Sequence, residues 1–204
     1  GIVKGGPLLF YQSHLKKMKA EKDIDGLLSF ISHEKAHKQA MQALLDCSSI
    51  PVLFKIYGFF SDKKKLLALS ENEPELEKSL PPQKVLVSRL AGLIRNMSFF
   101  LSVSLLAENL QKEHNENNII RLLDILNLVK AVGIEAVLIQ LLYNPLFAKN
   151  QMLTVKAVQL LGNQPDSKAG PVLAELLKPG RISCASAAAV VRALGNLRDE
   201  QAVQ

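Results

Sequence analysis

The last part of this chain repeats itself at an interval of 33 residues. Residues 156–169 (KAVQLLGNQPDSKA) match residues 189–202 (AVVRALGNLRDEQA), with Leu-Gly-Asn and then Asp-x-x-Ala at corresponding positions. An internal period of this length is typical of repeat arrays, in which each unit is one small element that cannot bury its apolar face alone. The chain is therefore expected to fold as a stack of similar units that share one apolar interior.

The same period can be followed toward the N-terminus. Asn163, at the end of the first copy, lies two periods after Asn96, and the apolar segment 119–129 supplies a helix for the unit between them. The best earlier match, residues 42–46, lies farther from Asn96 than one period, so that about 17 residues are extra. The array is thus expected to continue through most of the chain, with one insertion.

We place the insertion at residues 61–82. It opens with three lysines, continues through a run of glutamates around Pro74 and closes on Pro81-Pro82. Insertions in repeat proteins form loops on one face of the array, often the binding face. Residues 66–69 (LLAL) are too apolar for a linker, and they predict a short helix within the insertion.

Each unit is predicted to be a pair of helices, because apolar residues recur at helical spacing and no segment alternates for long enough to form a strand. Capping residues set the predicted boundaries. First helices are predicted to begin at Asp23, Ser48, near Leu101, near Gly133 and at Asp166, and second helices near Ser32, Gln83, Asn115, Pro145 and Arg181. Gly162 and Gly195 are predicted to end helices in a left-handed conformation. The predicted fold is all-α, with about five helix pairs in a single domain over residues 1–204.

The pattern of Asp-x-x-Ala opening a helix, followed by a second helix that ends Ala-Leu-Gly, resembles the HEAT repeat, particularly its short form in phycobilisome-lyase-type proteins. The likeness is strongest over residues 145–204, and residues 15–28 look like the opening unit of such chains. The surroundings of Asn96 look equally armadillo-like. The resemblance implies a right-handed superhelix of helix pairs, an α-solenoid, with a binding surface. It implies no chemistry, since fold does not fix function.

Charge and composition tell more about the possible partners of the chain than about its fold. A net charge of +6 and a pI near 9.3 permit acidic proteins or nucleic acid as partners. The longest apolar run, residues 97–107, is shorter than the roughly 20 residues that a membrane-spanning helix needs. Two cysteines without framework spacing favour a reducing compartment, so we expect a cytoplasmic or nuclear protein.

Because no partner helix follows the last unit, we expect a fragment of a longer array, or a last helix that pairs with another molecule.

Two rows of polar residues follow the second helices when the units are superposed. One row lies four residues before the repeated asparagine or its equivalent, and the other lies seven before it, so the rows are neighbours on a helix face. The polar side chains of the two rows are Gln39, Gln42, Arg89, Asp124, Asn127, Lys156, Gln159 and Arg192. In the families that the chain resembles, second helices line the concave surface. Any solvated helix face is polar as well, so the pattern alone does not distinguish binding from solvent exposure.

These rows predict a protein-interaction scaffold that binds a peptide or a helix along its concave face. Arg89 and Arg192 are the expected anchors, because arginine is enriched among the residues that dominate binding energy. The rows are mixed in charge and the chain has no tryptophan, which disfavours a nucleic-acid groove. Nucleic-acid binding is the alternative, through Lys16, Lys17, Lys19 and Lys22 or through residues 63–65.

A third alternative is a zinc-dependent hydrolase. His33-Glu34-x-x-His37 matches the motif in which two histidines bind zinc and the glutamate is the general base. However, Ser32 is the predicted N-cap, which would leave His33 in a solvent-facing first turn, and Lys35 and Lys38 break the pattern of mostly uncharged neighbours. We therefore expect surface histidines, no metal and no cofactor.

Overall fold

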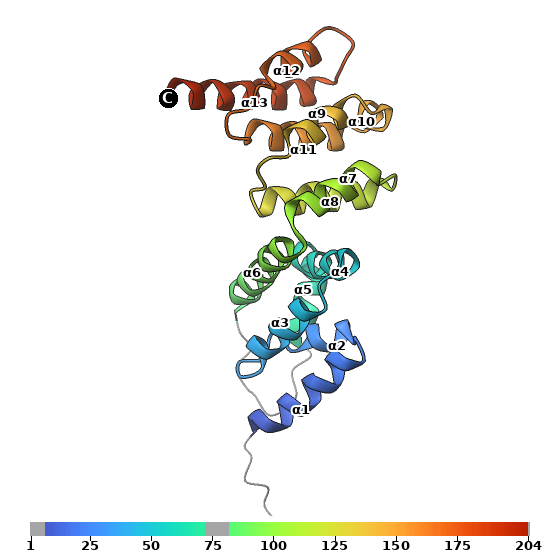
Figure 1. Cartoon of the computed structure of the whole chain (residues 1–204), viewed down its shortest axis with the longest axis vertical. Helices are drawn as coiled ribbons and strands as arrows, with labels where there is room; N and C mark the ends of the chain where they lie inside the picture. The colour runs from blue at the N-terminus through green and yellow to red at the C-terminus, as the bar shows by residue number, and fades with distance from the viewer. Residues whose placement is uncertain (1–6, 72–81, 204) are drawn as a thin grey trace, which may run out of the picture. The chain divides into compact units, whose positions relative to one another are not determined.

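The computed structural model describes residues 7–71 and 82–203, with the side chains of residues 11–70 and 82–198. Throughout these ranges the regular structure is helical, and no strand is formed (Figure 1). The prediction of an all-α fold is confirmed. The chain divides into two compact units, an N-terminal unit (Gly1–Leu101) and a C-terminal unit (Ser102–Gln204).

The N-terminal unit is built from two groups of helices. Its helices are α1 (Pro7–Ala20), α2 (Ile24–Ser29), α3 (His37–Asp46), α4 (Ile50–Ser61), α5 (Lys63–Glu71) and α6 (Gln83–Leu101). In the first group α2 packs on α3, and α1 packs on both; in the second, α4 packs on α6, and α5 contacts both. Helix α3 also contacts α6 and thereby joins the groups.

Helix α5 lies within the predicted insertion. It buries Leu66 and Leu69 against its neighbours, so the short helix that we expected from the apolar residues 66–69 is confirmed. The rest of the acidic run and Pro81 lie in residues 72–81, outside the described part of the chain.

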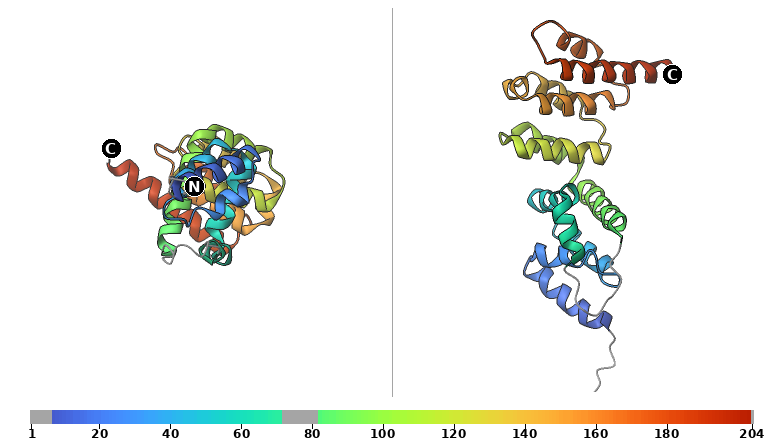
Figure 2. Two further views of the ribbon diagram at one scale, coloured as in Figure 1. Left: turned by 90° about the horizontal axis from the view of Figure 1, so that it is seen from below. Right: turned by 180° about the vertical axis from the view of Figure 1, so that it is seen from behind.

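The C-terminal unit is a stack of three helix pairs. Its helices are α7 (Val103–Lys112), α8 (Glu116–Leu128), α9 (Glu135–Leu142), α10 (Pro145–Lys149), α11 (Gln151–Gly162), α12 (Gly170–Leu176) and α13 (Cys184–Val203). The second helices of the pairs, α8, α11 and α13, lie side by side with α11 in the middle, and the first helices α7 and α9 pack on each other (Figure 2). The period read from the sequence therefore corresponds to repeated packing within this unit.

Helix α11 is the most deeply packed helix of the stack. Leu153, Ala157, Val158 and Leu161 are fully buried because α8, α9 and α13 contact this helix from different sides. Only a narrow strip of α11, which includes Gln159, remains exposed. A helix with so little exposed surface leaves few positions at which a polar side chain is tolerated.

Gly162 lets α11 and α13 approach closely. A Cβ atom added at Gly162 would lie 2.8 Å from both the Cα and the Cβ of Ala193 on α13. Gly195, one period later, is exposed in the middle of α13, with nothing within 4 Å of an added Cβ. The prediction of left-handed helix ends is wrong for both, since Gly162 is the last residue of α11 and neither has a positive φ.

Hydrogen bonds connect the loops of successive helix pairs at intervals close to the period. Gln164, which is 2% exposed, donates from Nε2 to the carbonyl oxygens of Ala131 (2.9 Å) and Leu160 (3.2 Å). Its Oε1 accepts from the backbone N–H of Ile134 (3.3 Å). A single buried side chain thereby joins the loop after α11 to the loop after α8. Neither the apolar periodicity nor a capping position in the sequence marks Gln164 as a structural residue.

Several predicted helix boundaries are confirmed. Asp23 caps α2, since its Oδ1 accepts from the backbone N–H of Gly26 (3.0 Å), and Asn115 caps α8 in the same way through Asn118 (3.2 Å). Pro145 begins α10 in a first turn, where its missing N–H costs no hydrogen bond. Helix α6 begins at the predicted Gln83.

Other boundaries differ from the prediction because of local turns. Ser32 is buried in a turn, and α3 begins only at His37. The cap of α4 is Ser49, whereas the hydroxyl of Ser48 donates to the carbonyl of Leu45. Asp166 adopts a φ of 54° in a turn, so that α12 begins at Gly170, and α13 begins at Cys184 rather than near Arg181. In the fourth pair, Asn150 caps a new helix after α10, so the main second helix is α11.

No single helix of the described residues is both long and apolar enough to cross a membrane, although the bent pair of α6 and α7 reaches that length and composition. Cys47 and Cys184 are both free thiols.

Candidate functional site

Three of the predicted binding residues lie exposed on the three second helices of the C-terminal unit. Asn127 is on α8, Gln159 on α11 and Arg192 on α13, each about one period from the next. We call these three residues the exposed row. A buried apolar residue stands next to each of them in its helix, although Val191, beside Arg192, is 57% exposed. The packing of the stack determines which side chains reach solvent.

A small hollow lies between α11 and α13 within the exposed row. It has a volume of about 130 Å³ and is lined by Gln159, Asn163, Ala189, Ala193, Arg192 and Asn196. The two alanines leave room between the helices, while the amides and the guanidinium surround it. Arg192 Nε donates to the carbonyl of Ala188 (3.4 Å), one turn earlier on α13. Asn163 and Asn196 were not among the predicted binding residues, although the repeat itself marks them.

A second hollow adjoins the first at Gln159. It has a volume of about 480 Å³ and is lined by Gln151, Met152, Val155, Lys156 and Gln159, all from α11. Met152 is 55% exposed, which is unusual for a large apolar side chain on this otherwise buried helix. Gln159 thus lies between a polar hollow and a second hollow that includes the apolar side chains of Met152 and Val155. Flexible methionine side chains are common at binding surfaces.

Asp124 and Lys156, two further predicted binding residues, bind each other. Lys156 Nζ on α11 lies 2.5 Å from Asp124 Oδ1 on α8, and the two side chains are 26% and 25% exposed. The ion pair joins neighbouring second helices one turn away from Asn127 and Gln159. Its first role is therefore to hold α8 against α11.

A double-mutant cycle measures that role. We expect Asp124→Asn and Lys156→Gln to show a coupling free energy of roughly 0.5–1 kcal/mol in urea unfolding, because the attraction in a partly exposed pair is weakened by solvent. The coupling should decrease at high salt, since ions screen the attraction. A coupling near zero at low salt would show that the pair does not hold the two helices together.

Arg89, on α6 of the N-terminal unit, is another predicted binding residue that already has a partner within the chain. Its Nη1 donates to the carbonyl oxygen of Ile31 (2.8 Å), in the turn between α2 and α3. Burial lowers the pKa of its guanidinium from the ordinary value, and the charge of Glu34 acts in the opposite direction. Arg89 thus joins the two helix groups of this unit, and it is less available as an anchor for a partner than Arg192.

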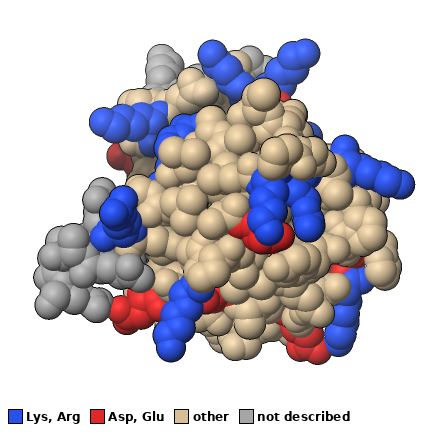
Figure 3. Space-filling model, turned by 90° about the horizontal axis from the view of Figure 1, so that it is seen from above, with Lys and Arg blue, Asp and Glu red and all other residues tan. Residues whose placement is uncertain are grey.

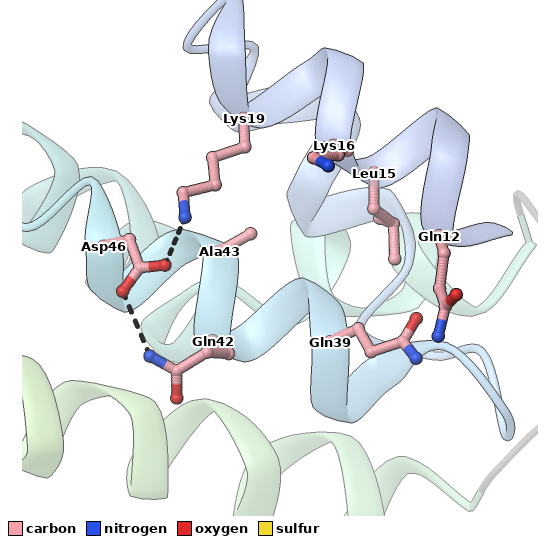
Figure 4. A pocket seen from close by; sticks show the side chains of 8 residues that line it. All are labelled: Gln12, Leu15, Lys16, Lys19, Gln39, Gln42, Ala43 and Asp46. Carbon is pink, nitrogen blue, oxygen red and sulfur yellow. Dashed lines mark hydrogen bonds and ion pairs between the residues drawn. The ribbon is translucent and has the colours of Figure 1, made fainter.

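Gln39 and Gln42 lie on α3 in the wall of a groove between α1 and α3 (Figure 4). The groove has a volume of about 400 Å³, and its other lining residues are Gln12, Leu15, Lys16, Lys19, Ala43 and Asp46. Asp46 accepts from Lys19 Nζ (2.5 Å) and from Gln42 Nε2 (3.1 Å). The hydrogen bond from Lys19, and after it that from Gln42, lowers the pKa of Asp46. The hydrogen bond to Asp46 in turn raises the pKa of Lys19. The pair therefore remains ionised around neutral pH.

The zinc-like motif lies mostly before helix α3, since His33 is in the segment between α2 and α3 and His37 is the first residue of α3. His33 is only 2% exposed and contacts the rings of Tyr11 and Phe30, so the prediction of a surface histidine is wrong here. Its Nδ1 accepts from the backbone N–H of Ala36 (3.1 Å), while His37 Nδ1 lies 2.8 Å from the carbonyl oxygen of Glu34. Among the described residues, no three His, Cys, Asp or Glu side chains are placed to share a metal ion.

The lysine clusters are partly engaged in contacts within the chain. Lys19 is paired with Asp46, and Lys65 Nζ lies 5.9 Å from the centre of the Phe59 ring. Figure 3 shows one face of the molecule, on which Lys and Arg side chains are spread over a mostly uncharged surface, with some Asp and Glu side chains beside them. A nucleic-acid site usually needs a continuous basic surface. Binding of nucleic acid through these lysines stays a prediction.

Comparisons with protein-family models, with curated proteins and with solved structures gave no match.

Proposed function

We propose that this chain is a HEAT-like or armadillo-like repeat scaffold that binds another protein, as a peptide or a helix, through the exposed row. The proposal includes a right-handed superhelical stacking of the helix pairs and a cytoplasmic or nuclear location. The residues that we assign to binding are Asn127, Gln159 and Arg192, with Asn163 and Asn196 beside them.

One observation supports this proposal above the others. Second helices that lie side by side present polar side chains at corresponding positions, with a hollow between Gln159 and Arg192. Solvent exposure alone explains polar residues, but it does not explain a hollow floored by Ala189 and Ala193 and bordered by two asparagines one period apart. Such a recess is suited to a side chain of a partner.

The chemistry of the row fits the backbone of a peptide. Amides of Asn127 and Gln159 can each donate to a carbonyl and accept from an N–H, so they can bind a peptide group in either direction. Arg192 adds a planar donor for carboxylates or carbonyls of the partner. The exposed Met152, next to Gln159, offers an apolar contact for a partner side chain.

Selection from a displayed library of random dodecapeptides tests this proposal. For peptides that are enriched on the purified protein, we expect Arg192→Ala to weaken binding by roughly tenfold and Gln159→Ala by roughly threefold, measured by fluorescence anisotropy. Arg198→Ala is the matched control, because Arg198 is an exposed arginine on another face of α13. It should change the affinity by less than about twofold.

Two results would contradict the proposal. Enriched peptides could bind equally well to the Arg192→Ala, Gln159→Ala and Asn127→Ala variants, which would place their site elsewhere. Alternatively, Arg198→Ala could weaken binding as much as Arg192→Ala, which would indicate attraction by net charge rather than recognition by the row.

A further inference from the structure

We propose that the groove between α1 and α3 binds an acidic peptide segment in an extended conformation. The groove belongs to the N-terminal unit, and it shares no residue with the exposed row of the C-terminal unit. The inference therefore goes beyond the proposed function, and it can be correct or wrong independently.

The groove combines an apolar floor with polar walls. Leu15 of α1 and Ala43 of α3 are buried beneath it. Gln12 and Lys16 line it from α1, and Gln39 extends from α3 toward Gln12 (Figure 4). A volume of about 400 Å³ is within the range of ligand pockets in proteins, roughly 300–1,000 Å³. A short segment with one small or apolar side chain pointing inward would fit this arrangement.

The charges of the walls favour an acidic occupant. Helix α1 contains Lys16, Lys17 and Lys19 and no aspartate or glutamate. The acidic residue in the groove, Asp46, is neutralised by Lys19. Among the described lining residues, the charge of Lys16 is consequently left without a counterion, and complementary charge would select an acidic partner and accelerate its association.

The hydrogen-bonding groups of the groove favour a peptide backbone. The side chains of Gln12, Lys16 and Gln39 make no hydrogen bond or ion pair with any other described side chain or backbone group. The Oε1 atom of Gln39 is shielded from solvent without a partner in the described residues. The terminal amide torsion of glutamine is soft, so this oxygen can turn into the groove without breaking an existing hydrogen bond. A peptide N–H would then satisfy it, while a peptide carbonyl accepts from Gln12.

A nucleic acid fits the groove less well. The phosphate groups of its backbone only accept hydrogen bonds, so they offer no donor to Gln39. Among the described residues, the lining contains no aromatic side chain on which a base could stack, although stacking is the main sequence-tolerant contact to single strands.

The probe for this site is a fluorescein-labelled octapeptide of alternating glutamate and alanine, measured by anisotropy with the full chain. We expect saturable binding, and Lys16→Gln should weaken it by roughly fivefold because one charge-assisted contact is lost. Lys17→Gln removes the same charge from the same helix outside the groove lining and should weaken binding by less than about twofold. The Arg192→Ala variant should bind the probe unchanged, which separates this test from that of the proposed function.

Backbone recognition is tested with the same peptide N-methylated at each alanine. Methylation removes the N–H donors and leaves the carboxylates, so we expect affinity to fall by roughly tenfold, together with a smaller loss for Gln39→Leu with the unmethylated probe. Absence of binding by the acidic octapeptide would overturn the inference. Equal losses in the Lys16→Gln and Lys17→Gln variants, equal affinity of the methylated peptide, or equally tight binding of an octathymidylate would overturn it as well.

Discussion

Alanine at Gly162 is expected to destabilise the C-terminal unit by roughly 1–3 kcal/mol, whereas alanine at Gly195 should stabilise it by roughly 0.5–1 kcal/mol. The two glycines occupy the same position of the repeat, one period apart. Their opposite responses follow from their surroundings. At Gly162 the new methyl group would lie 2.8 Å from the backbone of Ala193, so α13 would have to move.

Gly195 has no such neighbour. It lies in the interior of α13, exposed, with open space around an added Cβ. In a helix interior alanine is favoured over glycine because the unfolded chain loses less conformational freedom on folding. The close approach of α11 to α13, rather than glycine as a residue type, is therefore what the prediction tests.

Urea unfolding followed by circular dichroism measures both variants. The two variants carry the same chemical change, so the difference between their free energies of unfolding reports the contact with Ala193 together with the different positions of the glycines, at the end of α11 and in the interior of α13. Equal effects of the two substitutions would mean that α11 and α13 are not packed as closely as Gly162 indicates. Gly162→Ala combined with Ala193→Gly should recover part of the loss, since the second change removes one of the two colliding atoms.

The second large effect is expected at Gln164. Gln164→Leu should reduce the free energy of unfolding by roughly 2–4 kcal/mol, because it leaves the buried N–H of Ile134 and the buried carbonyl of Ala131 without their partner. Leucine is similar in size, so loss of packing contributes little. Gln159→Leu is the matched control, since Gln159 is exposed on α11, and it should change stability by no more than about 0.5 kcal/mol.

Hydrogen exchange gives a local measurement of the same effect. The amide of Ile134 donates to Gln164, and it should exchange faster in Gln164→Leu than the global loss of stability explains. If Gln159→Leu and Gln164→Leu destabilise the chain equally, or if exchange at Ile134 follows global stability only, then Gln164 does not join the two loops.

Features that depend on local sequence were predicted correctly. Caps such as Asp23 and Asn115 act on backbone groups three residues away, so their effect is readable without knowledge of the fold. Residues whose surroundings are set by distant parts of the chain were not. His33 was expected at the surface and is buried against Tyr11 and Phe30, and Gly195 was expected to end a helix that continues through it.

The candidate sites show the same contrast between what local sequence predicts and what the packing of the helices decides. Gln159 and Arg192 were selected from their positions in the repeat, but the hollow between them depends on how α11 and α13 pack. Asp124, Lys156 and Arg89 were selected in the same way, and each has a partner elsewhere in its own unit. The groove of α1 and α3 combines Lys16 and Gln39, which no sequence motif connects.

The sequence by itself determined an all-helical chain with a repeat of helix pairs, because helical periodicity and a fixed internal period are properties of short stretches of residues. Only the tertiary structure decided which of two equivalent glycines lies against a neighbouring helix, which polar side chains are already paired, and where the hollows lie. The physical reason is that close approach, burial and hydrogen bonding at a residue such as Gln164 depend on atoms about one repeat away, and a linear pattern does not record those distances.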